Sequence, residues 1–221
     1  MLLAVDTSTK NLGVALFDGV QVLSEMTWVS DQYHTVELAP TVESLMDRAG
    51  TSLSEIQVVT VALGPGSFTG LRIGLAFAKG MALAKHLDII GVPTLDILAA
   101  SQPLVNLPMV LVLHAGRGRL AVGWYKNSSN KWNPVNDVKV QTSRELAAEI
   151  KTPTIVCGEL TAEEQRIFRR KRKNVILYSP AQCMRRPSIL AELGWMRWRK
   201  GQIDDPAVLA PIYLHYKEQK N

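Results

Sequence analysis

Cysteines, aromatic residues and long apolar runs are all scarce in this chain of 221 residues. Its two cysteines, Cys157 and Cys183, are too few for a disulfide framework and lack metal-site spacing, which indicates reduced thiols. No apolar run reaches the roughly 20 residues that a membrane-spanning helix needs. The N-terminus lacks the basic and apolar regions of a signal peptide. We therefore expect a soluble, cytoplasmic protein without membrane contact.

The chain has a large fraction of apolar residues and an excess of positive charge. Hydrophobic residues make up 47% of it, which is enough to bury a core as one large domain or two small ones. The formal charge of +5 permits contact with nucleic acid but does not require it. Composition alone therefore leaves the class of partner open.

The first hundred residues predict an antiparallel meander followed by alternating helices and strands. Asp18-Gly19 is typical of a tight hairpin turn, and β-branched runs predict buried strands. The expected strands cover 2–5, 12–17, 20–28, 58–63 and 89–92, and the expected helices cover 34–49, 69–86 and 95–100. This order indicates an α/β layer with a mixed sheet.

A second series of strands followed by alternating helices and strands comes after Pro103–Pro108, a segment that we interpret as a domain boundary. Strands are expected at 109–114, 120–125, 134–140, 154–157 and 174–178, and helices at 143–150, 161–170 and 187–200. Thr161 and Glu164 fit a capping box. We expect a first subdomain of residues 1–102 completed by the helix at 187–201, a smaller second subdomain of 103–186, and a tail of 202–221.

Residues 64–74 form a glycine-rich turn between a buried strand and a helix. Free N–H groups at such a helix start can bind an anion. The segment lacks the Gly-Lys-Ser/Thr of a P-loop, and its glycines do not fit the dinucleotide fingerprint. A tight strand-to-helix connection with Thr69 as the N-cap is the other interpretation.

The helix that follows carries small residues at every fourth position, Gly70, Gly74, Ala78 and Ala82. Such a strip allows another element to approach closely. The strip predicts packing against the chain's own sheet or an interface with another chain. An adjacent apolar strip consists of Ile73, Phe77 and Met81.

The first strand ends in Asp6-Thr7-Ser8-Thr9. Hydroxyls and backbone N–H groups at this point can hold phosphates while the acid reaches a hydrated metal. Turns of the Asx and Ser/Thr type are also common after strands. The segment therefore predicts a nucleotide-binding hairpin or an ordinary turn.

Four segments together resemble the TsaB (YeaZ) family: GPGSFTGLRIG, AVDTST, YHTVELAP and APIYL. The resemblance implies an actin-like fold, a tandem of two ribonuclease-H-like subdomains. It implies a subunit that pairs with the catalytic homologue TsaD and works with the ATPase TsaE and a threonylcarbamoyl-AMP synthase. The outcome would be threonylcarbamoyl transfer to a tRNA adenosine beside the anticodon.

The resemblance also places the pairing surface on the first two long helices, 34–49 and 69–86. The expected interface residues are Leu38, Val42, Leu45, Gly70, Ile73, Gly74, Phe77, Ala78, Met81 and Ala82. Small-residue helices leave open whether the chain forms a homodimer when it is alone.

We expect a subunit that is not itself an enzyme and has no cofactor or metal of its own. The catalytic homologue carries an HxxxH motif, in which two imidazoles on one helix face chelate a metal. Here His34 stands first, but Leu38 replaces the second histidine. His114 stands where the family usually has an aspartate. ATP or ADP and metal are therefore expected in partner subunits. An independent actin-like ATPase or small-molecule kinase is the alternative, ahead of a metallopeptidase.

A basic run follows the expected helix at 161–170. It comprises Arg166, Arg169, Arg170, Lys171, Arg172 and Lys173. Cations suit a helix C-terminus, and they also attract the tRNA backbone without reading its sequence. Trp195 and Trp198 in the last helix predict core packing or base stacking.

Overall fold

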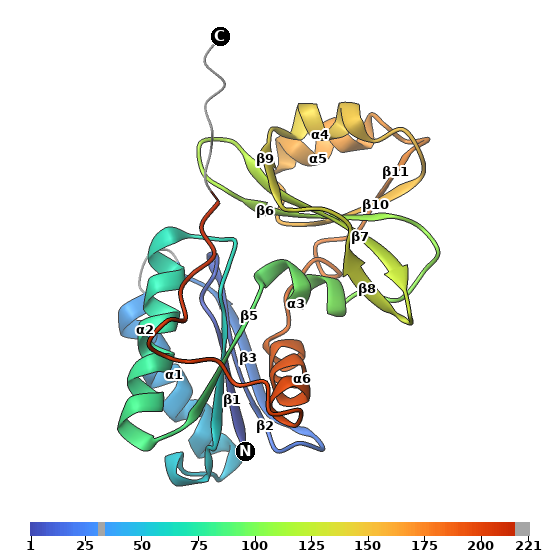
Figure 1. Ribbon diagram of the computed structural model, residues 1–221. Coiled ribbons are helices and arrows are strands. Elements are labelled where there is room, and N and C mark those ends of the chain that lie inside the picture. The colour runs from blue at the N-terminus through green and yellow to red at the C-terminus, as the bar shows by residue number, and fades with distance from the viewer. Residues whose placement is uncertain (31–33, 215–221) are drawn as a thin grey trace. The chain divides into compact units, whose positions relative to one another are not determined.

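A computed structural model describes residues 1–30 and 34–214 of the protein. The chain divides into two compact units (Figure 1). The first combines Met1–Ile97 with Arg185–Ile212, and the second is built from Leu98–Met184. The division falls five residues before the expected boundary at 102. Arg185 and the expected tail residues up to Ile212 belong to the first unit.

The sheet of the first unit has five strands in the order β3-β2-β1-β4-β5. Its strands are β1 (Leu2–Asp6), β2 (Asn11–Phe17), β3 (Val22–Val29), β4 (Val58–Ala62) and β5 (Asp88–Val92). The first three pair antiparallel as the expected meander, and β4 and β5 run parallel to β1. Because β1 is central, it is buried at all five positions.

Helices cover both faces of this sheet (Figure 1). On one face lie α1 (His34–Ala49) and α2 (Phe68–Lys85), and on the other lies α6 (Pro187–Trp198). Alternate strand residues supply the two cores, since successive side chains point to opposite faces. Leu3 and Val5 pack with α1 and α2, whereas Leu2 and Ala4 pack with α6. The connections include a 3-10 turn at Leu53–Glu55 and α3 (Thr94–Ala100).

The second unit repeats the strand scheme of the first. Its sheet runs β11-β10-β6-β7-β8, with β9 also paired to β7. The strands are β6 (Met109–His114), β7 (Leu120–Ser128), β8 (Lys131–Pro134), β9 (Lys139–Gln141), β10 (Thr154–Gly158) and β11 (Val175–Leu177). Two helices, α4 (Ser143–Glu149) and α5 (Ala162–Arg169), complete it. The expected single strand at 134–140 is wrong, because two short strands flank that stretch.

The expected tail of 202–221 is wrong for residues 202–212, which pack on the first unit. Asp204 forms a bridge to Ile89 of β5, and its carboxylate accepts the Gly91 N–H at 2.8 Å. Farther along, the Ile212 N–H donates to the Leu63 carbonyl at 2.7 Å. The Asp204 contacts cover β5, the edge strand of the sheet, where unpaired backbone groups would otherwise attract another strand. Within 1–30 and 34–214, no helix meets the length and apolarity that crossing a bilayer demands.

Candidate functional site

The glycine-rich turn brings α2 onto the first hairpin. Ser67, not Thr69 as expected, caps α2, and its Oγ accepts the Gly70 N–H at 3.2 Å. The Ser67 N–H in turn donates to the Ser8 carbonyl at 2.6 Å. A Cβ at Gly66 would overlap that same carbonyl, so only glycine allows this approach. The N–H groups of Ser67 and Gly70, which an anion at this helix start would need, are therefore already bonded within the chain.

The small-residue strip of α2 faces the chain's own sheet. A Cβ added at Gly70 would overlap the Thr7 carbonyl, and one at Gly74 would overlap the Thr7 Oγ1. Ala78 and Ala82 are 0% and 4% exposed. The expectation that these four residues form a partner surface is therefore wrong, because Gly70 and Gly74 pack on Thr7, and Ala78 and Ala82 lie in the buried core between α2 and the sheet.

The three interface residues expected on α1 are buried in the same core. Leu38, Val42 and Leu45 are at most 5% exposed and pack against the sheet and α2. Helical spacing put them on one apolar face, and that face is the inner one. Of the ten expected interface residues, only Ile73, Phe77 and Met81 are partly accessible.

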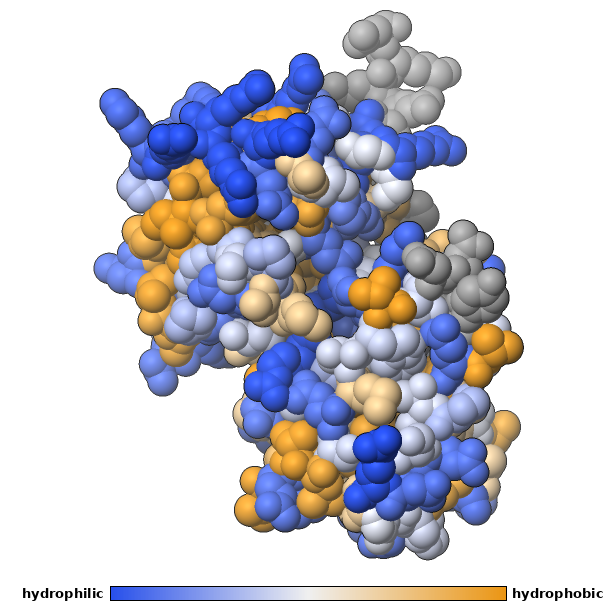
Figure 2. Space-filling model, turned by 180° about the vertical axis from the view of Figure 1, so that it is seen from behind, coloured by the Kyte–Doolittle hydropathy of each residue, from blue (hydrophilic) through white to orange (hydrophobic). Residues whose placement is uncertain are grey.

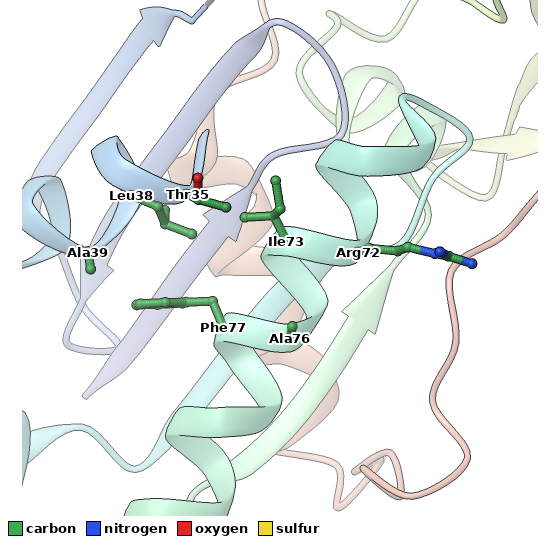
Figure 3. A pocket seen from close by; sticks show the side chains of 7 residues that line it. All are labelled: Thr35, Leu38, Ala39, Arg72, Ile73, Ala76 and Phe77. Carbon is green, nitrogen blue, oxygen red and sulfur yellow. The ribbon is translucent and has the colours of Figure 1, made fainter. Parts of the chain in front are cut away.

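An apolar groove runs along the accessible side, between α1 and α2 (Figure 3). It has a volume of about 350 Å³. Its lining residues are Thr35, Leu38, Ala39, Arg72, Ile73, Ala76 and Phe77. Figure 3 shows Ile73 and Phe77 pointing toward α1, while the Arg72 side chain extends away from it. Buried Leu38 closes the inner side of the groove.

Exposed apolar side chains continue this surface along α2. Phe68 is 53% exposed and Leu83 is 81% exposed. The Arg72 guanidinium lies 3.8 Å from the centroid of the Phe68 ring, which is cation–π geometry. Sequence reasoning missed Phe68, Arg72, Ala76 and Leu83. Their spacing opposite the glycines could have indicated an outward face.

The end of β1 is an inward-facing polar cluster. Asp6, Thr7, Ser8 and Thr9 are at most 6% exposed. The Asp6 carboxylate accepts the Ser8 N–H at 2.9 Å, and it accepts Nε of Arg185 at 2.9 Å. The Thr7 hydroxyl donates to the Gly70 carbonyl at 2.7 Å. The four residues expected at a nucleotide site thus lie together, with their side-chain polar groups bonded inside the chain.

Comparisons with known proteins agree with this architecture. A family model described as TsaD: tRNA N6-adenosine threonylcarbamoyltransferase matches residues 21–178. A relative from Bacillus subtilis (strain 168), named tRNA threonylcarbamoyladenosine biosynthesis protein TsaB, is 30% identical over 98% of this chain and 95% of its own. The chain belongs to the TsaB (YeaZ) family. This family takes part in the biosynthesis of threonylcarbamoyladenosine in tRNA.

Solved structures confirm the fold of this TsaB-family chain. YeaZ from Pseudomonas aeruginosa has a TM-score of 0.78 at 24% identity, covering 96% of this chain and 99% of that one. An activator of 2-hydroxyisocaproyl-CoA dehydratase from Clostridium difficile, solved with bound ADPNP, has a TM-score of 0.52 at 11% identity, covering 91% and 96%. The expected actin-like fold class, two mixed sheets flanked by helices, is therefore confirmed.

The second unit carries the basic run at the end of α5. Figure 2 shows strongly hydrophilic side chains gathered over the end of this unit that holds α4 and α5. All six cations of the run are exposed: Arg166, Arg169, Arg170, Lys171, Arg172 and Lys173. The α5 capping box is confirmed, since the Thr161 Oγ1 accepts the Glu164 N–H at 3.2 Å.

The remaining singled-out residues serve packing or lie apart. Trp195 packs edge-on to Phe17 with ring centroids 5.7 Å apart, and Trp198 donates its indole N–H to Asp88. His114 lies 3.9 Å from the Glu164 carboxylate. Residues 215–221 of the expected tail lie outside the described residues. Across 1–30 and 34–214, no three or more His, Cys, Asp or Glu side chains are grouped as a metal site requires.

The two cysteines of this TsaB-family chain interact in the second unit. A hydrogen bond between their thiols lowers the pKa of Cys183 to about 7 and raises the pKa of buried Cys157. Cys183 is partly exposed, whereas Cys157 is buried. Cys183 is therefore the thiol that ionises first.

Proposed function

We propose that this chain is a non-catalytic subunit that pairs with the catalytic homologue TsaD and activates threonylcarbamoyl transfer to the tRNA adenosine beside the anticodon. The observation that carries the proposal is the exposed apolar groove between α1 and α2. The partner supplies the metal and the reaction, and the ATPase TsaE joins the same complex with its own nucleotide.

The chemistry of the groove suits a protein partner. Each 100 Å² of apolar surface removed from water there contributes about 2.5 kcal/mol. Aromatic and arginine side chains are the usual anchors of interfaces, and Phe77, Phe68 and Arg72 stand on this face. Arg72 lies at the rim of the groove, where its guanidinium stacks on Phe68 and presents a positive charge to an acidic side chain of the partner.

A partner of the same fold fits this surface best. The family model described as TsaD matches residues 21–178 of this chain, and that range contains both helices. A homologue of this fold presents the equivalent pair of helices. Two such pairs of helices can pack about a pseudo-two-fold axis. In that arrangement the α1–α2 surface of this chain contacts the equivalent surface of its homologue.

Two positions argue against an independent enzyme. Leu38, where the metal motif would need its second histidine, is 2% exposed and has no donor atom. His114 ends β6, where an acid is usual in the family. The alternative ATPase or kinase would depend on Asp6–Thr9, whose polar groups already bond within the chain.

The basic run is proposed to contact the tRNA backbone in the complex. Its six cations lie within eight residues and are all exposed, so their charges sum over a small surface. Such a surface attracts phosphates without sequence preference, and the attraction weakens as salt displaces the released counterions. The tRNA would thereby be oriented for the partner to modify.

The pairing is tested by co-purification with the TsaD homologue of the same host. Ala76 is exposed and lines the groove, so Ala76→Glu places a carboxylate in the apolar contact without disturbing the core. We expect at least a tenfold weaker complex with an unchanged melting temperature. Ala148→Glu, the same change at an exposed position of α4, is the matched control and should leave pairing intact.

Two results would overturn the proposal. If Ala76→Glu pairs as tightly as the unaltered chain, the interface lies elsewhere. If the purified chain alone transfers a threonylcarbamoyl group to tRNA, it is not an accessory subunit. Both measurements use the full chain. The transfer assay supplies threonylcarbamoyl-AMP that is radiolabelled in its threonine, and it measures the label that reaches the tRNA fraction as AMP leaves.

A further inference from the structure

The hairpin after β1 holds an arginine that comes from the far end of the chain. Arg185 Nε donates to the Asp6 Oδ2 at 2.9 Å, with both side chains at most 4% exposed. The Arg185 Nη2 donates to the Thr9 Oγ1 at 2.6 Å and to the Asn11 carbonyl at 3.2 Å. One guanidinium therefore bonds the acid, a hydroxyl and a backbone oxygen of the same hairpin.

The segment that carries Arg185 is fixed on both sides. Arg186 forms an ion pair with Glu25 of β3 at 2.6 Å, and the Ser188 hydroxyl donates to the same carboxylate at 3.0 Å. Burial raises the pKa of Glu25, but these bonds outweigh it and hold the pKa below its usual value. Pro187 lies so close to Gly13 that a Cβ there would collide with it. The guanidinium is thus held in place by the start of α6.

This arrangement does not fit a magnesium nucleotide. Mg²⁺ demands octahedral oxygen ligands and keeps several waters, so an acid that serves it must open onto solvent or phosphate. Asp6 is 3% exposed, and it already accepts from Ser8 and from a guanidinium that stays charged at every physiological pH. A second cation beside Arg185 would be repelled at short range in a poorly solvated site.

We propose that Arg185 is a built-in cation that neutralises Asp6 and closes this hairpin to divalent metals and their nucleotides. The chain keeps the acid and hydroxyls of a phosphate-binding hairpin, and it uses them to anchor α6. Removing the guanidinium gives back a divalent-cation site beside Asp6. The proposal does not depend on the pairing surface, since the groove and the hairpin share no residue.

The test is a titration of the full chain with Mn²⁺, followed by the electron paramagnetic resonance signal of the free ion. Mn²⁺ stands in for Mg²⁺ because it prefers the same oxygen ligands. We expect no saturable Mn²⁺ binding at Asp6 in the unaltered chain, so the unaltered chain and the Asp6→Asn variant should bind Mn²⁺ equally. Arg185→Gln, which removes the charge and keeps a side-chain N–H donor, should gain one site, and the double variant Asp6→Asn, Arg185→Gln should lose it.

Arg186→Gln is the matched control, since it removes a neighbouring cation that does not touch Asp6 and should gain no site. A folded Arg185→Gln chain without a new Mn²⁺ site would contradict the proposal. So would saturable binding of Mn²⁺ or of magnesium ADP by the unaltered chain that Asp6→Asn abolishes. That last titration decides the question even if every Arg185 variant fails to fold.

Discussion

Two glycines of one helix give a sharp test of which way α2 faces. Gly74 and Gly80 both lie inside α2, so replacing either by alanine brings the same gain in helix propensity. A Cβ at Gly80 meets nothing within 4 Å. A Cβ at Gly74 would overlap Thr7 Oγ1 and stand 3.3 Å from Thr7 Cβ. The two substitutions should therefore change stability in opposite directions.

The magnitudes follow from the surroundings of each position. Gly80→Ala should stabilise the chain by about 0.5–1 kcal/mol, the propensity difference in an exposed helix interior. Gly74→Ala gains the same amount, but overpacking costs about 1–3 kcal/mol and displacing the Thr7 hydroxyl from the Gly70 carbonyl costs about 1 kcal/mol. The net effect of Gly74→Ala is a loss of about 1–3.5 kcal/mol.

Thermal unfolding of the two variants measures this difference. For a chain of this length, 1 kcal/mol corresponds to about 2–4 °C in the melting temperature. Gly74→Ala should melt several degrees below the unaltered chain, and Gly80→Ala a few degrees above it. In a Thr7→Ala background the penalty of Gly74→Ala should shrink, because the obstructing hydroxyl is gone. Equal stabilisation by both alanines would refute the inward orientation of the glycine strip.

Three further predictions concern the hairpin, the thiols and the RNA. Arg185→Ala should lower the free energy of unfolding by about 3–5 kcal/mol in urea, because it leaves the Asp6 charge buried without its partner; in the Asp6→Asn background the loss should be smaller. Alkylation of Cys183 by iodoacetamide should rise with pH through a midpoint near the pKa of about 7, as its thiolate forms, and Cys157→Ala should move that midpoint upward. Replacing two arginines of the basic run by alanine should flatten the plot of log tRNA affinity of the complex against log salt by about 1 per lost phosphate contact.

Much of the secondary structure could be predicted because its causes are local. The capping box of Thr161 and Glu164 spans three residues, and the structure has both of its hydrogen bonds. The antiparallel pairing at the start of each half was predicted from strand patterns that occur twice along the chain. The single strand predicted at 134–140 was wrong. The structure has two short strands there, β8 with four residues and β9 with three, and alternation over so few residues is too short a pattern to recognise in the sequence.

The candidate site was only half predictable, since its decisive contacts join residues far apart in sequence. Arg185 and Asp6 are 179 positions apart, and nothing near either one indicates the other. The packing of residues 202–212 on β5 likewise has no local sign. Periodicity showed that Gly70 and Gly74 allow a close approach, but it could not show that Thr7 of the same chain is what approaches.

The two faces of α2 are physically linked, and this gives a way to tell their roles apart. The glycines let α2 settle against the end of β1, and that depth sets how far Ile73, Ala76 and Phe77 stand out along the groove. A change on the inner face should therefore weaken pairing only as a consequence of moving the helix, and it should lower the melting temperature at the same time. A change on the outer face should weaken pairing alone. Co-purification and thermal unfolding should therefore distinguish the two variants: Gly74→Ala should lower the melting temperature and weaken pairing, and Ala76→Glu should weaken pairing alone. If Gly74→Ala abolishes pairing while the melting temperature is unchanged, the inner strip does reach the partner and the groove is not the docking surface.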